Sequence, residues 1–190
     1  MNPHGHGTPL GTEAARRLAT LGSIRIEPGL SDDEIACAEV ELGFSFAEDH
    51  RALLASGLPV GTGWPNWRTP DGRRSALRHL RSPVEGILFA VEWTSFWDDR
   101  WGRRPAQMKH ALRSAAYHLA RVPQMVPVHA HCYLPAGHGS SGHPVLSIYQ
   151  AAISIAGAEL RDYVECGILG ATPAPEPAVS TVDFWSDHVR

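Results

Sequence analysis

The stretch Pro123-Gln-Met-Val-Pro-Val-His-Ala-His-Cys-Tyr-Leu-Pro135, together with the segment that follows it to Cys166, decides the fold class of this chain. Its prolines cannot donate to a β-ladder, so it predicts an edge or irregular strand. A loop over 136–143 leads to Pro144-Val-Leu-Ser-Ile-Tyr-Gln150, whose alternation predicts a second strand. A third short apolar run covers 152–156, and residues 158–164 can then turn as a helix. We therefore expect strands that pair as hairpins and are closed by a helix.

Helices are expected on both sides of a central segment. Thr12 can cap a first helix, and Ser31-Asp-Asp-Glu34 is a capping box for a second one that ends at Gly43. Another helix is expected from about 47 to 55. After residue 105, apolar residues recur at steps of four and three, which predicts the clearest amphipathic helix of the chain. These residues are Met108, Leu112, Ala115, Leu119 and Val122.

The central segment predicts a loop and a strand. Residues 58–72 are dense in glycine and proline, which favours a structured loop that carries Trp64 and Trp67. The run from Val84 to Trp93 alternates in a way that predicts a strand buried on one face and partly on the other. The expected fold class is therefore α+β: a single domain with an antiparallel or mixed β-sheet, flanked by N-terminal helices and one amphipathic helix.

Length and composition indicate one domain with tails. The chain has 190 residues, 43% hydrophobic residues and six tryptophans, which is enough for one real core and argues against disorder. Phe184 and Trp185 would be costly to leave in water, so we expect the C-terminal end to dock back on the body. The expected divisions are a flexible tail over 1–11, the domain over 12–170, an Ala/Pro spacer over 171–180 and a docking segment over 181–190.

Charge, cysteines and hydropathy narrow the class of protein. A net charge of −3 gives no general attraction to nucleic acid or anionic membranes. The three cysteines are odd in number and far apart in the sequence, which indicates neither a disulfide framework nor a zinc knuckle. They are Cys37, Cys132 and Cys166. The N-terminus lacks a basic start followed by an apolar run, and about eighteen consecutive apolar residues occur nowhere. We expect a soluble, cytoplasmic protein that needs no cofactor.

A group of imidazoles is the most tempting site for catalysis. His129, His131, His138 and His143 lie close together in sequence with Cys132, and His-x-His on a strand points both rings to one face. A metal-dependent hydrolase using His129, His131 and His143 is thus an alternative. No acidic residue lies between Arg100 and Glu159 to activate a water, so histidines in solvent or in the core are favoured.

Two other chemistries have weaker signals. The glycine-rich loop around Ser140 lacks the glycine that a nucleophile elbow needs two residues earlier, where His138 stands. No phosphate-binding or dinucleotide fingerprint is present. The arginines between Arg68 and Arg81 follow two tryptophans, which leaves a nucleic-acid-binding module as an alternative, although neighbouring acids offset them.

The order of several sequence strings resembles the SUKH superfamily, the Smi/Knr-type domain, in its actinobacterial form. The match covers about residues 24–189. The strings that carry it are Gly29-Leu-Ser-Asp-Asp-Glu-Ile35, Glu41-Leu-Gly43, His50-Arg-Ala-Leu-Leu54, Leu58-Pro-Val-Gly61, Pro83-Val-Glu-Gly-Ile-Leu-Phe89, Phe96-Trp97, Trp101-Gly-x-Arg-Pro105, Val126-Pro-Val-His-Ala-His-x-Tyr-Leu-Pro135, His143-Pro-Val-Leu-Ser-Ile-Tyr-Gln150 and Phe184-Trp-Ser-Asp187. The resemblance implies an α+β fold and a binding module, as in immunity proteins that neutralise toxins or in regulatory interaction hubs. Ala151 to Ala156 departs from the family pattern, which there carries an aspartate and two tyrosines.

These observations favour a non-catalytic protein-binding domain, and the resemblance implies an immunity or antitoxin-like protein that neutralises a toxin partner. Tryptophan and arginine dominate interface energetics, so the expected partner-binding face takes its residues from these two types. They are Trp64, Trp67, Arg68, Trp97, Arg100, Trp101 and Arg103. The alternative is that these tryptophans fill a core beneath loops. The identity of the partner and the oligomeric state stay open.

Overall fold

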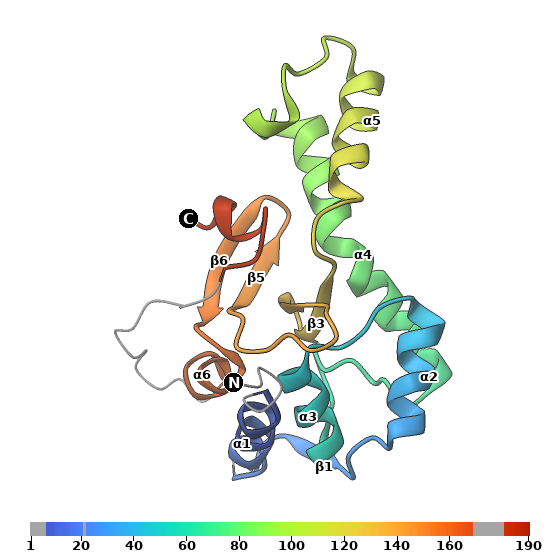
Figure 1. Ribbon diagram of the computed structural model, residues 1–190, viewed down its shortest axis with the longest axis vertical. Coiled ribbons are helices and arrows are strands. Elements are labelled where there is room, and N and C mark those ends of the chain that lie inside the picture. The colour runs from blue at the N-terminus through green and yellow to red at the C-terminus, as the bar shows by residue number, and fades with distance from the viewer. Residues whose placement is uncertain (1–6, 21, 169–180) are drawn as a thin grey trace.

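The structure is a computed structural model that describes residues 7–20, 22–168 and 181–190, and it has an α+β fold (Figure 1). In chain order its elements are α1 (Gly7–Thr20), β1 (Arg25–Glu27), α2 (Asp32–Leu42), α3 (Glu48–Ser56), β2 (Leu58–Val60), α4 (Pro70–Trp93), the 3-10 turn η2 (Asp99–Trp101), α5 (Met108–Leu119), β3 (Met125–His129), β4 (Cys132–Pro135), β5 (Val145–Tyr149), β6 (Ala152–Gly157), the single turn α6 (Leu160–Asp162), the π-helical turn η3 (Tyr163–Ile168) and the 3-10 turn η4 (Ser186–His188). The expected fold class is confirmed.

The decisive stretch forms the main sheet. Strands β3, β4, β5 and β6 follow one another as an antiparallel meander, while β1 and β2 pair as a separate two-stranded ribbon. The register places Val126 opposite Leu134, and it shifts between Pro127 and His129, where the proline-rich strand is irregular. Leu146 and Ile148 of β5 are buried. The strands predicted over 144–150 and 152–156 are confirmed as β5 and β6. The single irregular strand predicted over 123–135 is instead a hairpin of two strands, β3 and β4, because the chain turns back at Ala130 and His131.

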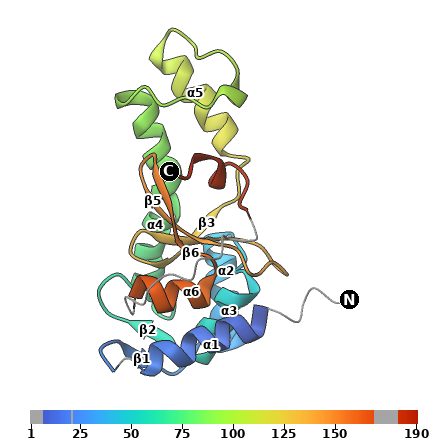
Figure 2. The ribbon, with the colours of Figure 1, turned by 90° about the vertical axis from the view of Figure 1, so that its left-hand side faces the viewer.

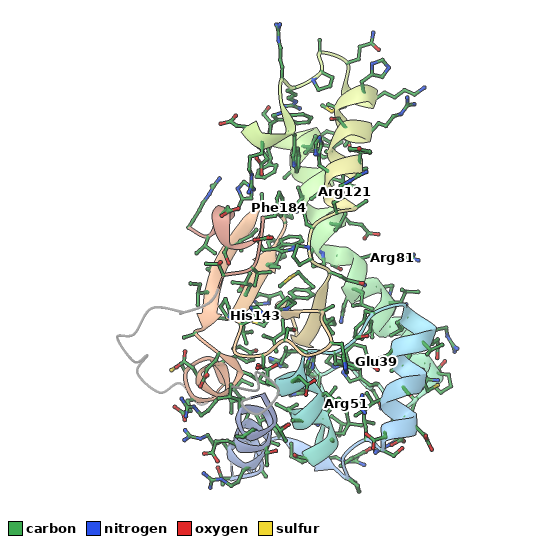
Figure 3. All side chains as sticks on the ribbon, in the orientation of Figure 1. Glu39, Arg51, Arg81, Arg121, His143 and Phe184 are labelled. Atoms are coloured by element: carbon green, nitrogen blue, oxygen red, sulfur yellow. The ribbon has the colours of Figure 1, made fainter. Side chains whose placement is uncertain are left out.

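The signals predicted for the helix from Ser31 to Gly43 act as expected. The Ser31 hydroxyl accepts from the Glu34 amide at 3.2 Å, the Glu34 carboxylate accepts from the Ser31 amide at 2.8 Å, and Gly43 ends α2 with φ of 74°. Arg51 of α3 lies 3.7 Å from Glu39 of α2, and Figure 3 shows the two side chains between these helices. The amphipathic helix after residue 105 is confirmed as α5.

The predicted strand from Val84 to Trp93 is wrong, because this segment is the second half of the long helix α4. Thr69 caps α4 by accepting from the Gly72 amide at 3.1 Å, and Pro70 occupies the first turn, where its missing N–H costs nothing. The buried residues recur at helical spacing, with Ile87 and Val91 one turn apart. Apolar residues lie on several faces of this helix, so their order in the sequence imitates the two-residue alternation of a strand.

The N-terminal segment also differs from the expectation. Residues 7–11, expected to be loose, begin α1, and Gly7 and Gly11 are buried. The predicted cap at Thr12 is therefore wrong, because Thr12 lies inside this helix. A Cβ at Gly11 would lie 2.0 Å from the backbone oxygen of Asp49, so glycine permits α1 to approach α3 this closely. Residues 1–6 of the expected tail and the expected spacer over 171–180 lie outside the described residues.

The core is arranged in three levels along the long axis of the molecule (Figures 1 and 2). The lowest level joins α1, α2, α3 and the start of α4 to β3 and β4. The middle level packs the sheet against the middle of α4 and the C-terminal segment, where Trp185 is fully buried. The top level lies between α4 and α5 and includes Phe96, Trp97 and Trp101 of the loop that joins them. These antiparallel helices project beyond the sheet, and we call residues 84–122 the hairpin.

Candidate protein-binding surface

The structure separates the residues predicted for one binding face into two groups. Trp64, Trp67 and Arg68 precede α4, whereas the residues between Trp97 and Arg103 follow it. At a rise of 1.5 Å per residue, the 24 residues of α4 span about 36 Å. The two groups therefore lie at opposite ends of a long helix and do not form one continuous surface.

The first tryptophans lie within the body of the protein. Trp67 is only 1% exposed, and its ring packs edge-on against Phe46 at 5.1 Å and near Phe44 at 5.9 Å. Trp64 is partly buried, and its ring lies 4.5 Å from the imidazole of His129. Trp67 therefore fills the core beneath a loop, as the alternative to a binding face predicted.

Arg68 links the loop before α4 to the start of α2. Its guanidinium donates to Glu34 at 2.7 Å, to Glu27 at 3.3 Å and to the backbone oxygens of Pro28 and Gly29. The hydrogen bond from Arg68 lowers the pKa of Glu34 below its usual value. A guanidinium that is engaged with two carboxylates and two carbonyls has little left to offer another protein.

The second group belongs to the loop at the end of the hairpin. Trp101 stacks between the rings of Phe184 and His118, each 5.8 Å away, and Trp97 donates its indole N–H to the Gly102 oxygen at 2.7 Å. These rings therefore attach the loop to α5 and to the C-terminal segment.

Arg100 and Arg103 differ in their surroundings. Arg100 pairs with Asp98 and Asp187, and its hydrogen bonds to Asp98 lower the pKa of that carboxyl group to about 2. His188 completes this network at 3.1 Å from Asp98. Arg103 is exposed and makes no ion pair with any residue that the structure describes. Of the predicted arginines, Arg103 is thus the one available on the surface.

The predicted metal ligands are not gathered around one point. Within the described ranges, no three His, Cys, Asp or Glu side chains are placed to hold a metal ion. His129 lies 3.1 Å from the Tyr163 hydroxyl, and burial lowers the pKa of this imidazole. Burial raises the pKa of the Cys132 thiol and of the Tyr163 hydroxyl, so both stay protonated. His129, Cys132 and Tyr163 therefore form a partly buried polar cluster next to Trp64.

The arginines of the Arg68–Arg81 segment are largely committed to acids of the same chain. Arg68 pairs with Glu34, Arg73 with Glu41, and Arg74 with Asp71. Arg81 points away from the body (Figure 3). Since internal pairs reduce the charge that phosphates would meet, this geometry gives the nucleic-acid alternative little support.

Sequence reasoning missed a pair of exposed aromatic residues on α4. Phe89 is 45% and Trp93 68% exposed, and their rings lie 6.2 Å apart on α4. Met108 and Tyr117 of α5 are also exposed, at 39% and 58%. A helical period from Ile87 to Val91 would have placed Phe89 and Trp93 away from the core face. The mistaken strand instead placed both with the buried residues.

A shallow groove of about 540 Å³ runs beside these aromatics, between α4 and α5. Its floor is apolar, with Leu88 and Phe89 on one side and Leu112 and Ala116 on the other. Glu85 and Glu92 line it on α4, and Arg113 lines it on α5. The hairpin thus presents an apolar, concave surface with acidic and basic margins.

Charge is also distributed unevenly between residues 70–122, which include α4 and α5, and the rest of the chain. Residues 70–122 carry ten Lys or Arg and five Asp or Glu, a net charge of +5. The remainder carries seven basic and fifteen acidic residues, a net charge of −8. The small net charge of the whole chain conceals this separation.

No family model, curated protein or solved structure matches this chain. In the part of the chain that the structure describes, no helix has the length and apolar character required to cross a membrane.

Proposed function

We propose that this chain is a non-catalytic protein-binding domain, an immunity or antitoxin-like protein that neutralises a toxin by covering it. The proposal combines the resemblance to the SUKH superfamily with the shape of the hairpin. It places the protein in the cytoplasm, where an incoming toxin would act, and requires neither metal nor cofactor.

The exposed pair Phe89 and Trp93 is the observation that carries the proposal. Large aromatic side chains at the surface cost free energy in water and are enriched among the residues that dominate binding. Here they stand beside an apolar groove on helices that project from the body (Figure 1). A protein partner that covers this surface removes the apolar area from water.

The chemistry-bearing side chains favour binding over catalysis. The buried thiol of Cys132 and the imidazole of His129 are held in neutral forms, and the arginines near the start of α4 are paired. Within the described ranges no three His, Cys, Asp or Glu side chains are grouped as metal ligands, so the geometry gives the hydrolase alternative no support.

Co-expression with a toxic neighbour tests the function. Candidate toxin domains, taken from the reading frames adjacent to that of this chain, would each be induced in a host cell with and without this chain. We expect co-expression to restore growth and the two proteins to copurify. Failure to restore growth, with both proteins present and soluble, would contradict the proposal.

Paired variants then test the surface. Phe89→Ala with Trp93→Ala removes the exposed aromatic pair and should weaken binding at least tenfold, as hot-spot truncations do. Val40→Ala is the matched control, because Val40 is an exposed apolar residue, at 83%, on α2 in the body. If both variants bind the partner equally well, the hairpin is not part of the interface.

A further inference from the structure

We infer that the groove between α4 and α5 receives one amphipathic helix of the protein partner, with a basic flank against α4 and an acidic flank against α5. This inference rests on the proposed function and specifies its binding element. The groove is the one formed by Leu88, Phe89, Leu112 and Ala116, with charged margins on both helices.

The groove has the geometry of a helix pair that lacks a third member. Leu88 and Leu112 are half-buried and pack on the small cluster of Val91, Ala111 and Ala115 that joins the two helices. Two antiparallel helices side by side leave a furrow into which the ridge of another helix fits. Since the 12 residues of α5 extend about 18 Å, the partner helix would engage over roughly three turns.

The margins of the groove carry opposite charges that have no internal partner. Glu85 and Glu92 stand two helical turns apart on α4, and Arg113 lies on α5 with exposed Lys109 one turn before it. None of the four forms an ion pair with another described residue. This contrasts with Arg68, Arg73 and Arg100, whose charges are satisfied within the chain. Charge complementarity therefore asks for Lys or Arg opposite α4 and for Asp or Glu opposite α5.

A second copy of this chain fits the groove less well than a single helix. Two copies placed face to face would oppose one concave surface to another, which leaves space above Leu88 and Leu112 where contact is needed. Nucleic acid fits less well again, because Glu85 and Glu92 would repel the phosphates that Lys109 and Arg113 attract.

The opposite margins determine the direction in which the helix lies. Turning a bound helix end over end, with its apolar stripe still in the groove, exchanges its left and right flanks. A helix with one basic and one acidic flank thus satisfies both margins in one direction only. A helix with the same charge on both flanks always meets one margin of like charge, whichever way it lies.

A helix library provides the test. Sixteen-residue amphipathic peptides, with a fixed leucine stripe and flanks randomised among Lys, Glu and Gln, would be displayed and selected on the purified full-length chain. We expect enrichment of peptides with Lys on one flank and Glu on the other. Enrichment of one charge on both flanks, or the absence of enrichment, would overturn the inference.

Two protein variants sharpen the readout. Glu85→Lys with Glu92→Lys makes both margins basic, so an enriched peptide should lose at least tenfold in affinity while a peptide with Glu on both flanks gains. Leu112→Glu should abolish binding, and Val40→Ala should leave it unchanged. Circular dichroism checks that each variant is folded. An enriched peptide that binds the charge-reversed variant as it binds the original chain refutes the assigned margins, even if Leu112→Glu fails to fold.

The other occupants give distinct results. If a second copy fills the groove, the chain alone sediments as a dimer and Glu85→Lys with Glu92→Lys alters that dimer. If nucleic acid fills it, a 20-residue oligonucleotide displaces the selected peptide. Either result overturns the inference. Growth rescue that persists in Glu85→Lys with Glu92→Lys would leave the immunity function standing and reject only the groove as its site.

Discussion

Replacing Trp185 by alanine is the sharpest test of how the C-terminal segment supports the fold. Trp185 is fully buried in the middle level of the core, where its ring lies 5.1 Å from that of Phe184. Its indole N–H donates to the backbone oxygen of Pro123 at 2.8 Å, just before β3. The segment is thus attached to the stretch of sequence that builds the sheet.

The expected loss can be worked from this burial. A tryptophan side chain buries roughly 150–250 Å², which at about 25 cal/mol per Å² corresponds to about 4–6 kcal/mol. Measured costs for Trp→Ala in cores are about 3–5 kcal/mol, and the Pro123 oxygen also loses its donor. We expect about 4–5 kcal/mol for Trp185→Ala. Trp185→Phe keeps most of the volume and should cost about 1–2 kcal/mol, mainly for the hydrogen bond.

Urea denaturation followed by far-UV circular dichroism measures these losses. With a slope of about 2 kcal/mol per M, Trp185→Ala should lower the midpoint by about 2 M. Trp93→Ala is the matched control, since Trp93 is 68% exposed and its removal should change stability by about 0.5 kcal/mol or less. If the free energies of unfolding of the two alanine variants differ by less than about 1 kcal/mol, the docking of the C-terminal segment is refuted.

Three further predictions concern the body of the protein. Burial lowers the pKa of His50 to about 3, so below pH 6.5 the unfolded chain binds a proton that the folded chain does not, and the free energy of unfolding falls as the pH drops. At pH 5 the loss of stability is about 2 kcal/mol. His50→Phe should remove this part of the pH dependence in urea titrations. Gly11→Ala places a Cβ 2.0 Å from a backbone oxygen of α3 and should lower the melting temperature by roughly 5–10 °C, or about 2–3 kcal/mol, whereas exposed Thr12→Ala in the same helix should change it little. Exposed Cys37 should react with a thiol reagent in the native protein, and buried Cys132, whose pKa is raised, should react only on unfolding; equal native rates would contradict the structure.

Local signals in the sequence predicted those parts of the fold that neighbouring residues determine. The capping box at Ser31 and the apolar periodicity of α5 both involve residues three or four positions apart. Both helices form as these signals predicted. Strands β5 and β6 follow from short apolar runs separated by turns, whereas the turn that divides β3 from β4 was not predicted. Each of these signals is complete within a dozen residues.

Long-range packing determined what the sequence failed to predict. The segment from Val84 to Trp93 packs against α5, the sheet and the C-terminal segment, which lie far from it in sequence, so local signals did not decide between its helical period and a two-residue alternation. That error concealed the exposed aromatics. The separation of Trp67 from Trp101 follows from it, because a helix of about 36 Å replaced an expected loop and strand.

The uneven charge of the chain has a consequence for association rates. The hairpin carries six basic and four acidic residues, a net charge of +2, while the rest of the chain carries a net charge of −5, so the projecting end of the molecule is more positive than the body. In the field of an acidic partner, such a molecule turns during diffusion so that its positive end leads, and productive collisions become more frequent. Salt would slow this approach without altering the contacts finally made.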